Sequence, residues 1–342
     1  MIRRALHLCL AVVAAVVLTE RADACAYDAI HVLPSSFDPT GAATDPPTST
    51  AAPTANVQAD ITAALALAPQ FFKTQLCNLD GIYVTQGPES WGYRNIANGK
   101  RYVALSASLW DASGPTKKYS KHQDEVAARL LKSWPGLGHN PGPNNAADTP
   151  AMAVLAALAH EFGHVLFYDT FVSPRGSAPT YTNPNFCGGT FFTDSWQILP
   201  ATPIPWRAYG IPAGSHKSDD MQTSDLLAVL PPSGGSDYRA GRKLDQIYSL
   251  TGTNSPRGRW ASLFATFSPD EDFVETFKLF VMKNAAQPLA SMPALYLVDG
   301  TFVTQDIPAT CSQRPVLVKK LGCFAQKFCA TQPAPSACGR CP

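Results

Sequence analysis

The chain has 342 residues, 45% of them hydrophobic, with 27 Lys or Arg against 26 Asp or Glu and a formal net charge of +1. This length and apolar content suffice for one sizeable core and a small appendage. The near-neutral charge, without a basic stripe, argues against nucleic acid or an anionic membrane surface as a partner, and we expect neither.

The N-terminus has the features of an export signal. Arg3 and Arg4 precede an apolar run over 5–18, which is too short to cross a bilayer comfortably. A small-residue cleavage site follows at 22–24, so we expect residues 1–24 to be a signal peptide. We find no later stretch that is long and apolar enough for a membrane span. The sequence therefore predicts a secreted or periplasmic protein without stable membrane association.

Residues 25–58 are expected to be a linker. Within it, 34–57 is rich in Pro, Thr, Ala and Ser and poor in aliphatic bulk, which is typical of a flexible spacer. The folded part should begin with a helix over 59–76, whose apolar residues recur at helical spacing. Runs rich in β-branched and aromatic residues then predict strands over 81–85 and 101–110.

A second helix is expected over 122–134, followed by a loop over 136–150 that is rich in Gly, Pro and Asn. His139 lies in this loop and could be drawn in as a metal ligand. A histidine beside glycines in a loop is more often solvated, and we favour that interpretation.

The apolar run from 151 to 167 contains the segment His160-Glu161-Phe162-Gly163-His164. On a helix, histidines four residues apart lie on one face, so both imidazoles can bind one Zn²⁺. Glu161 lies about 100° further round, where its carboxylate can reach a water in the open position of the metal and act as general base. Two hydrogen-bonded core histidines are the alternative, but this charged set would be costly to bury without a purpose.

Residues 170–267 contain few long periodic stretches. The first part is rich in Pro, Gly, Thr and aromatic residues, and short helices are plausible over 219–230 and 240–250. We interpret 170–267 as an insertion that forms a cap or wall beside the histidine helix.

Another helix is predicted to begin at Ser268, which precedes a proline, three acids and an apolar stripe. Glu271 and Glu275 lie one turn apart on this helix. Glu271 also has the spacing of a capping box, in which its carboxylate would only bond back to the Ser268 amide. We interpret Asp270 and Asp272 as first-turn acids that complement the helix dipole.

The pairing of HEFGH with EDFVE resembles the gluzincin zinc peptidases, the thermolysin-like and lethal-factor-like clan. The resemblance covers the two helices around 151–169 and 268–283, and more weakly a strand before them. It implies that the first acid binds zinc, so that Glu271 completes the ligand set of His160 and His164. Glu275 would then hold a ligand histidine. If Glu271 is only a capping residue, Glu275 becomes the ligand; we favour Glu271.

The resemblance implies an α+β fold with a zincin-like catalytic domain over 59–310: a small mixed sheet plus an active-site helix, and a helical second half that follows the insertion. In such a fold an edge strand borders the cleft and can pair with an extended substrate. The strand at 101–110 is our candidate, and an ordinary inner strand is the equal alternative.

Two features depart from the gluzincin pattern. The 106 residues between His164 and Glu271 (165 to 270) exceed the compact gluzincin arrangement. The lethal-factor-like enzymes keep a tyrosine shortly before the ligand glutamate, where this chain has Phe264 and Phe267. The residue that would stabilise an oxyanion must therefore come from elsewhere, and four residues of the insertion are candidates: Tyr209, His216, Tyr238 and Tyr248.

Residues 311–342 form a Cys-rich tail. Of the nine cysteines, Cys9 lies in the signal segment and five of the other eight lie in this tail: Cys311, Cys323, Cys329, Cys338 and Cys341. Five is odd, so at least one of them must pair outside the tail or stay free. We expect a disulfide to Cys187, Cys77 or Cys25 that fastens the tail to the domain. The CxxC spacing of the last two is interpreted as structural.

The expected function is that of a secreted peptidase that holds one Zn²⁺ per chain, hydrolyses peptides or proteins and uses Glu161 as general base. Two other classes remain open. The fold could serve as a non-catalytic zincin-like binding protein, or the chain could be a Cys-rich structural protein with an accidental HExxH.

Overall fold

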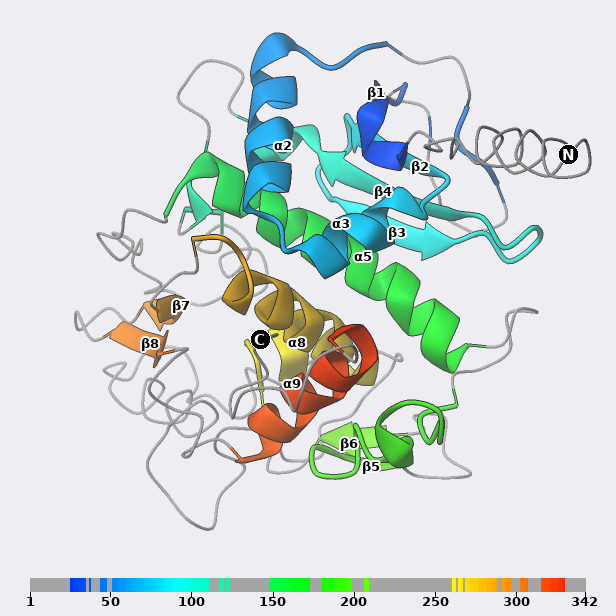
Figure 1. Ribbon diagram of the computed structural model, residues 1–342, viewed down its shortest axis with the longest axis vertical. Coiled ribbons are helices and arrows are strands. Elements are labelled where there is room, and N and C mark those ends of the chain that lie inside the picture. The colour runs from blue at the N-terminus through cyan, green and yellow to red at the C-terminus, as the bar shows by residue number, and fades with distance from the viewer. Residues whose placement is uncertain are drawn as a thin grey trace, which may run out of the picture.

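The fold is organised around one long helix, α5 (Pro150–Phe171), which packs on a sheet and on the helix α8 (Figure 1). The computed structural model describes the residues 25–34, 37, 44–47, 51–110, 117–119, 121–122, 148–172, 180–198, 206–208, 260–262, 264–266, 268–287, 291–296, 302–306 and 315–329. The expected mixed α+β class is confirmed, with a small sheet and, in this part of the chain, five α-helices.

The main sheet has four strands in the order β1-β2-β4-β3. Its members are β1 (His31–Val32), β2 (Gly81–Thr85), β3 (Trp91–Arg94) and β4 (Arg101–Ser106). β1, β2 and β4 run parallel, and β3 pairs antiparallel with β4, so the sheet is mixed as expected. The candidate edge strand at 101–110 is instead the inner strand β4, which ends in a short 3₁₀ helix (Ala107–Leu109). The two edge positions belong to β1 and β3.

The predicted linker over 25–58 is built into the domain at both ends. Cys25 forms a disulfide with Cys77, and a 3₁₀ turn (Ala26–Asp28) leads to β1. Ile30 and Leu33 are buried at either side of β1, so these apolar side chains hold the segment on the sheet. Helix α2 then begins at Ala55, within the expected spacer.

The helix expected over 59–76 is two helices, α2 (Ala55–Leu67) and α3 (Gln70–Cys77). Pro69 has no amide hydrogen to donate and disfavours helical backbone at the preceding residue. Ala68 accordingly is extended, with φ −62° and ψ 136°, and the chain turns there. Phe72 of α3 and Ile61 of α2 are fully buried in the core that surrounds α5.

Helix α5 begins with two local signals. Thr149 is its N-cap and accepts the Met152 amide hydrogen at 3.2 Å, and Pro150 occupies the first helical position. By length and composition α5 is long and apolar enough to cross a membrane, so our expectation that no such stretch follows the signal was wrong. Its most apolar window is 78% buried inside the protein, as in the core helix of a globular domain.

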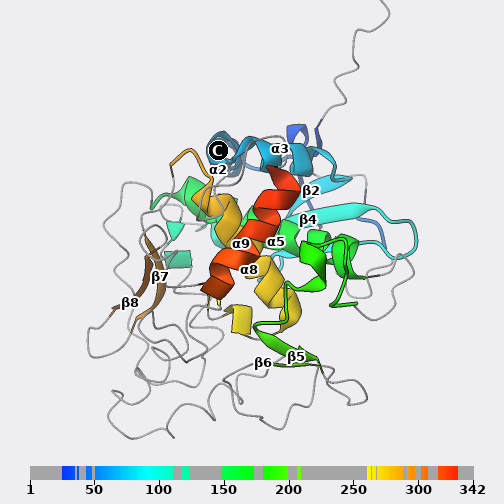
Figure 2. The same cartoon turned by 60° about the horizontal axis from the view of Figure 1, so that its bottom comes forward.

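The second half packs on the other side of α5. It contains α8 (Pro269–Lys283) and α9 (Pro315–Phe328), which lie against each other (Figure 2). Three short elements come from the predicted insertion: the 3₁₀ turns Cys187–Gly189 and Phe264–Thr266, and the hairpin of β5 (Trp196–Ile198) with β6 (Trp206–Ala208). A second hairpin pairs β7 (Ser291–Tyr296) with β8 (Phe302–Asp306).

Part of the insertion belongs to the core rather than to a cap. Phe186, Phe191, Phe192 and Trp196 are buried with α5, α8 and α9. The expected signal peptide and the helices expected over 219–230 and 240–250 lie outside the described residues, as do all but His122 of the helix expected over 122–134. Of the loop expected over 136–150, residues 136–147 with His139 also lie outside them, and Pro150 is the first residue of α5.

The tail is fastened to the domain as predicted. Cys323 of α9 forms a disulfide with Cys187, and Leu321 and Phe324 of the same helix enter the core. These disulfides are compatible with an oxidising compartment. Cys311, Cys338 and Cys341 lie outside the described residues.

The sheet approaches α5 closely at Gly92 of β3. A Cβ added there would lie 1.9 Å from the backbone oxygen of Glu161. We predict that Gly92→Ala lowers the free energy of unfolding by about 3 kcal/mol or more, since backbone cannot yield as a flexible side chain can. Urea denaturation would measure this.

Gly322 of α9 provides the control, because a Cβ there meets nothing within 4 Å. Gly322→Ala should stabilise the protein by up to about 1 kcal/mol through helix propensity alone. If the Gly92→Ala protein were as stable as the wild type, the close contact of β3 with the α5 backbone at Glu161 would be contradicted.

Candidate metal centre

Helix α5 presents His160 and His164 on one face. Their ring centroids are 5.0 Å apart, and their side chains are 15% and 18% exposed. Ligand atoms of His160, Glu161 and His164 all lie within 4.8 Å of one another. The i, i+4 spacing therefore brings the three residues of the sequence motif together in space, as a helix requires.

Helix α8 brings Glu271 to this face. Ser268 caps the helix by accepting the Glu271 amide hydrogen at 3.0 Å, which fixes the first turn. The two Glu271 carboxylate oxygens lie 3.8 Å from His160 Nε2 and 3.6 Å from His164 Nε2. Two tetrahedral zinc ligands, each about 2.0–2.1 Å from the metal, are about 3.3 Å apart. Glu271 therefore lies near enough to both Nε2 atoms to share a small cation with the histidines.

A second carboxylate lies at the Nδ1 atom of each histidine. Glu275 Oε1 is 2.7 Å from His160 Nδ1, and Asp270 Oδ2 is 3.3 Å from His164 Nδ1. An imidazole that donates its Nδ1 hydrogen to a carboxylate leaves the Nε2 lone pair free for a metal. Both Nε2 atoms face Glu271, so three of the four acids of α8 contact the histidines: Glu271 lies at the Nε2 atoms, and Asp270 and Glu275 lie at the Nδ1 atoms.

Lys278 forms a buried ion pair with the Glu275 carboxylate. Its Nζ lies 2.6 Å from both carboxylate oxygens of Glu275, and neither side chain is more than 5% exposed. Burial alone would raise the pKa of Glu275, but the charge of Lys278 and the hydrogen bond of His160 outweigh it and hold the pKa well below its usual range. Glu275 is therefore ionised and fixed in place.

Burial and neighbouring charges shift the pKa values of Glu271, His164 and Glu161 in opposite directions. Burial raises the pKa of Glu271 to about 7, against the attraction of the two histidines. Burial acts to lower the pKa of His164, but Asp270 and Glu271 outweigh it and raise the pKa to about 10. Burial also raises the pKa of Glu161, which His160 and His164 partly counteract. Glu161 and Glu271 are thus largely removed from water beside the two imidazoles, whereas Asp270 stays one third exposed.

The donor set fits a zinc ion. One buried oxygen of Glu271 has no hydrogen-bond partner among the described residues, and it is an oxygen that faces His160. A buried carboxylate oxygen without a partner is costly unless a cation or a donor satisfies it. Two imidazoles and one carboxylate are also the ligand types that catalytic zinc uses.

Gly163, inside the motif, lets the two helices approach. A Cβ there would lie 3.1 Å from both Cα and Cγ1 of Val274, which is tighter than ordinary contact. A Cβ here would require Val274 of α8 to move by a few tenths of an ångström, so glycine allows the present spacing of the two helices. Phe162 and Phe277 continue the contact between the same two helices, with ring centroids 5.8 Å apart.

Phe264 lies where the lethal-factor-like pattern has a tyrosine. Its ring stacks on His160 at a centroid distance of 5.6 Å and an interplanar angle of 13°. It therefore packs against the imidazole and offers no hydroxyl to a substrate. The other candidates for that task, Tyr209, His216, Tyr238 and Tyr248, and also Phe267, lie outside the described residues.

Three residues of the site were not anticipated in these roles. Asp270 was interpreted only as a helix-dipole acid, yet it contacts His164. Lys278 and Phe264 carried no local signal, because only the packing of α8 and the 3₁₀ turn against α5 brings them to the histidines. The position of Asp270 in the sequence does point to a contact with a histidine, because it directly precedes Glu271 on the turn that faces α5.

Comparison with known proteins adds no assignment. No family model, no curated protein and no solved structure matches this chain.

Lys278 generates a stability prediction. In the metal-free protein, Lys278→Met leaves the buried Glu275 carboxylate without its cation, which should cost about 3–5 kcal/mol at pH 7. Denaturant titration would measure the loss. Lys100→Met is the matched control, because Lys100 is 49% exposed and pairs with Asp45 at the surface, 3.0 Å away. That change should cost less than about 1 kcal/mol.

The cost of Lys278→Met should also depend on pH. The fold depresses the pKa of Glu275, so its contribution to stability is present above the unfolded-state pKa and is lost as the pH falls. The difference between wild type and variant should therefore narrow below about pH 4. A difference that stayed constant from neutral to acidic pH would contradict this account of Glu275.

Proposed function

We propose that this chain is an exported zinc-dependent peptidase, in which His160, His164 and Glu271 bind one Zn²⁺. The observation that carries the proposal is the position of Glu271. Its two oxygens face the Nε2 atoms of both histidines at 3.8 and 3.6 Å, while other carboxylates hold the Nδ1 atoms. Glu275, held by Lys278, is then the residue that orients His160.

Zinc in such a site supplies Lewis-acid polarisation of a carbonyl and lowers the pKa of a water molecule to near neutrality. The chain's own residues supply the proton transfers. The Glu161 carboxylate accepts a proton from the attacking water at one Oε and gives it to the nitrogen of the leaving amine as the C–N bond breaks. Burial raises the pKa of Glu161, which favours a carboxyl that can both take and return a proton.

The edge strand β3 is suited to hold an extended peptide. It pairs with β4 on one side only within the described residues, and its Gly92 touches the backbone of Glu161. A peptide added as a further strand would receive backbone hydrogen bonds from β3. Its scissile bond would then pass close to the general base. The substrate class we propose is therefore a peptide or an unfolded protein segment.

Substitution of Glu161 tests the mechanism. Glu161→Gln removes the proton acceptor but none of the proposed ligands, so the variant should keep about one zinc per chain and lose turnover by at least about 10²-fold. His160→Ala should lose both zinc and turnover. The measurements are metal content by mass spectrometry and cleavage of a peptide library with and without a chelator.

A Glu161→Gln protein as active as the wild type would refute the peptidase mechanism. A wild type that binds zinc but cleaves no peptide would instead favour the non-catalytic binding protein. Wild-type protein without zinc after metal loading would favour the Cys-rich structural protein.

The two glutamates of α8 can be separated by their effect on the metal. Glu271→Gln replaces a proposed ligand with a neutral amide and should release zinc under conditions in which the wild type keeps it. Glu275→Gln should weaken zinc binding only about 10–100-fold, as the loss of an orienting partner does. Competition with a coloured chelator measures both. The reverse order of severity would make Glu275 the ligand.

A further inference from the structure

Asp272 follows Glu271 directly but points away from the histidines into the core. Its side chain is fully buried and forms an ion pair with Lys320 of α9, which is only 1% exposed. Lys320 Nζ lies 2.8 Å from Oδ1 and 2.5 Å from Oδ2 of Asp272. The positive charge of the tail helix is thus held at the first turn of α8, on Asp272 rather than on the acids that contact the histidines.

Other side chains complete the surroundings of this ion pair. Trp196 Nε1 donates a hydrogen bond to Asp272 Oδ2 at 2.9 Å. The Thr276 hydroxyl donates to the Asp272 backbone oxygen at 2.6 Å. Lys320 Nζ lies 5.1 Å from the Trp260 ring centroid and 5.7 Å from that of Phe191. The carboxylate and the ammonium therefore each have one defined position.

The geometry of a helix links this pair to the metal side. Successive residues project about 100° apart, so three consecutive acids at the start of α8 cover most of the circumference. Asp270 and Glu271 face the two histidines, and Asp272 faces Lys320. A rotation of α8 that freed Asp272 would also turn Glu271 away from the Nε2 atoms.

A buried ion pair adds little to stability compared with apolar residues of the same size, because both charges lose their hydration. What such a pair can supply is one fixed arrangement. We propose that Lys320 is a positioning residue for the metal centre, which acts through Asp272 to set the rotation of α8 and hence the aim of Glu271. This inference rests on the proposed zinc site.

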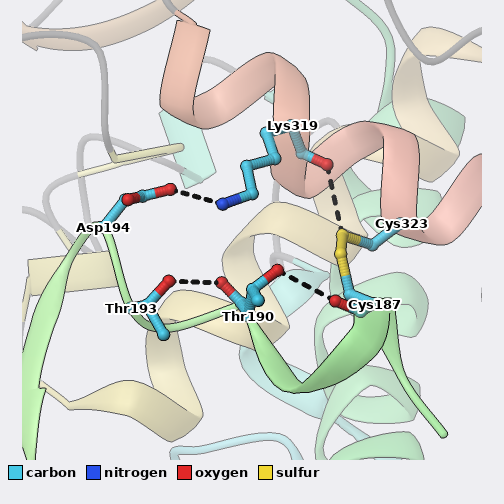
Figure 3. Close-up of a disulfide and its surroundings, with 6 residues drawn as sticks. All are labelled: Cys187, Thr190, Thr193, Asp194, Lys319 and Cys323. Atoms are coloured by element: carbon cyan, nitrogen blue, oxygen red, sulfur yellow. Dashed lines mark hydrogen bonds and ion pairs between the residues drawn. A yellow bond between two sulfur atoms is a disulfide. The ribbon is translucent and has the colours of Figure 1, made fainter. Parts of the chain in front are cut away.

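The attachment of α9 supports the same role. Figure 3 shows the disulfide of Cys323 with Cys187 and the ion pair of Lys319 with Asp194. The two charged atoms of that pair are 2.7 Å apart. Cys323 follows Lys320 by about one turn of α9. The chain from Cys187 to Asp194 leads directly to Trp196, which donates to Asp272. The disulfide thus joins the two segments that hold Asp272, one through Lys320 and one through Trp196.

The decisive variant replaces both charges while keeping their shapes, Asp272→Asn with Lys320→Met. It avoids a lone buried charge, so we expect a folded protein with the far-ultraviolet circular dichroism of the wild type. Its zinc affinity should fall about 10–100-fold, the range expected when an orienting group is lost. The cobalt-substituted variant should show altered d–d absorption, which reports ligand geometry and is independent of turnover.

The neighbouring surface pair provides the control. Lys319 and Asp194 are 45% and 43% exposed. Lys319→Met with Asp194→Asn therefore removes one positive charge from α9 and one carboxylate that pairs with it, without touching Asp272. Its zinc affinity and cobalt spectrum should match the wild type. If the buried double variant fails to fold, Trp196→Phe tests the same carboxylate by removing one donor. It should lower zinc affinity several-fold and change the cobalt spectrum.

The role of Lys320 would be overturned if the folded Asp272→Asn, Lys320→Met variant had the zinc affinity and the cobalt spectrum of the wild type. If that variant does not fold, the same result in Trp196→Phe would overturn it. The proposed zinc site would survive that result. Failure of the wild type itself to bind zinc or cobalt would overturn the proposed function first, so the two failures are distinguishable.

Discussion

The contact between α5 and α8 is the constraint on which the rest of the structure depends. Gly163 permits Val274 to approach within 3.1 Å of where a Cβ would be, and at this separation Glu271 lies 3.8 and 3.6 Å from the Nε2 atoms of the two histidines. The aromatic rings around the contact fill the space on either side of it, among them Phe162 against Phe277 and Phe167 against Phe273. Close packing therefore sets the geometry of the polar site.

Removing these charged side chains from water is unfavourable in free energy, and ion pairing between them offsets part of that cost. Glu275 is held by Lys278 and Asp272 by Lys320, with all four side chains nearly inaccessible to water. Glu275 and Lys278 both lie on α8, next to His160, whereas Asp272 of α8 pairs with a residue of α9. Because an unpaired buried charge is strongly unfavourable, alternative packings of α8 that separate these partners are disfavoured. The pairs thus select one arrangement of the helix.

Most of the helical framework could be predicted from the sequence because its signals are local. The capping residues Thr149 and Ser268, each followed by proline, mark the starts of α5 and α8, and periodic apolar residues predict their buried faces. β3 was missed because four residues, one of them glycine, are too few to show an alternating pattern. The break at Pro69 was missed because apolar residues recur at helical spacing on both sides of it.

The part of the site that lies within one helix could also be predicted from the sequence, whereas the contacts between distant segments could not. The histidines and Glu161 lie within five residues, and helix geometry alone brings them together. The pairing of Asp272 with Lys320 joins residues 48 apart and has no signature in either segment. Cysteine parity was more informative, since an odd number in the tail required a partner elsewhere or a free thiol, and Cys187 was among the partners expected. Long-range pairing is readable from sequence only where such counting rules apply.

The disulfide between Cys187 and Cys323 has a topological consequence. Its partners are 136 residues apart, and the covalent ring they close contains the whole of α8. In the chain-entropy account, closing a ring of this size removes about 5 kcal/mol of conformational freedom from the unfolded chain. A chain in a reducing compartment would have to dock α8 on α5 without that advantage. Assembly of the histidine and glutamate cluster is thereby coupled to the redox state of the surroundings, so the oxidised protein would hold the cluster far more firmly than the newly made, reduced chain.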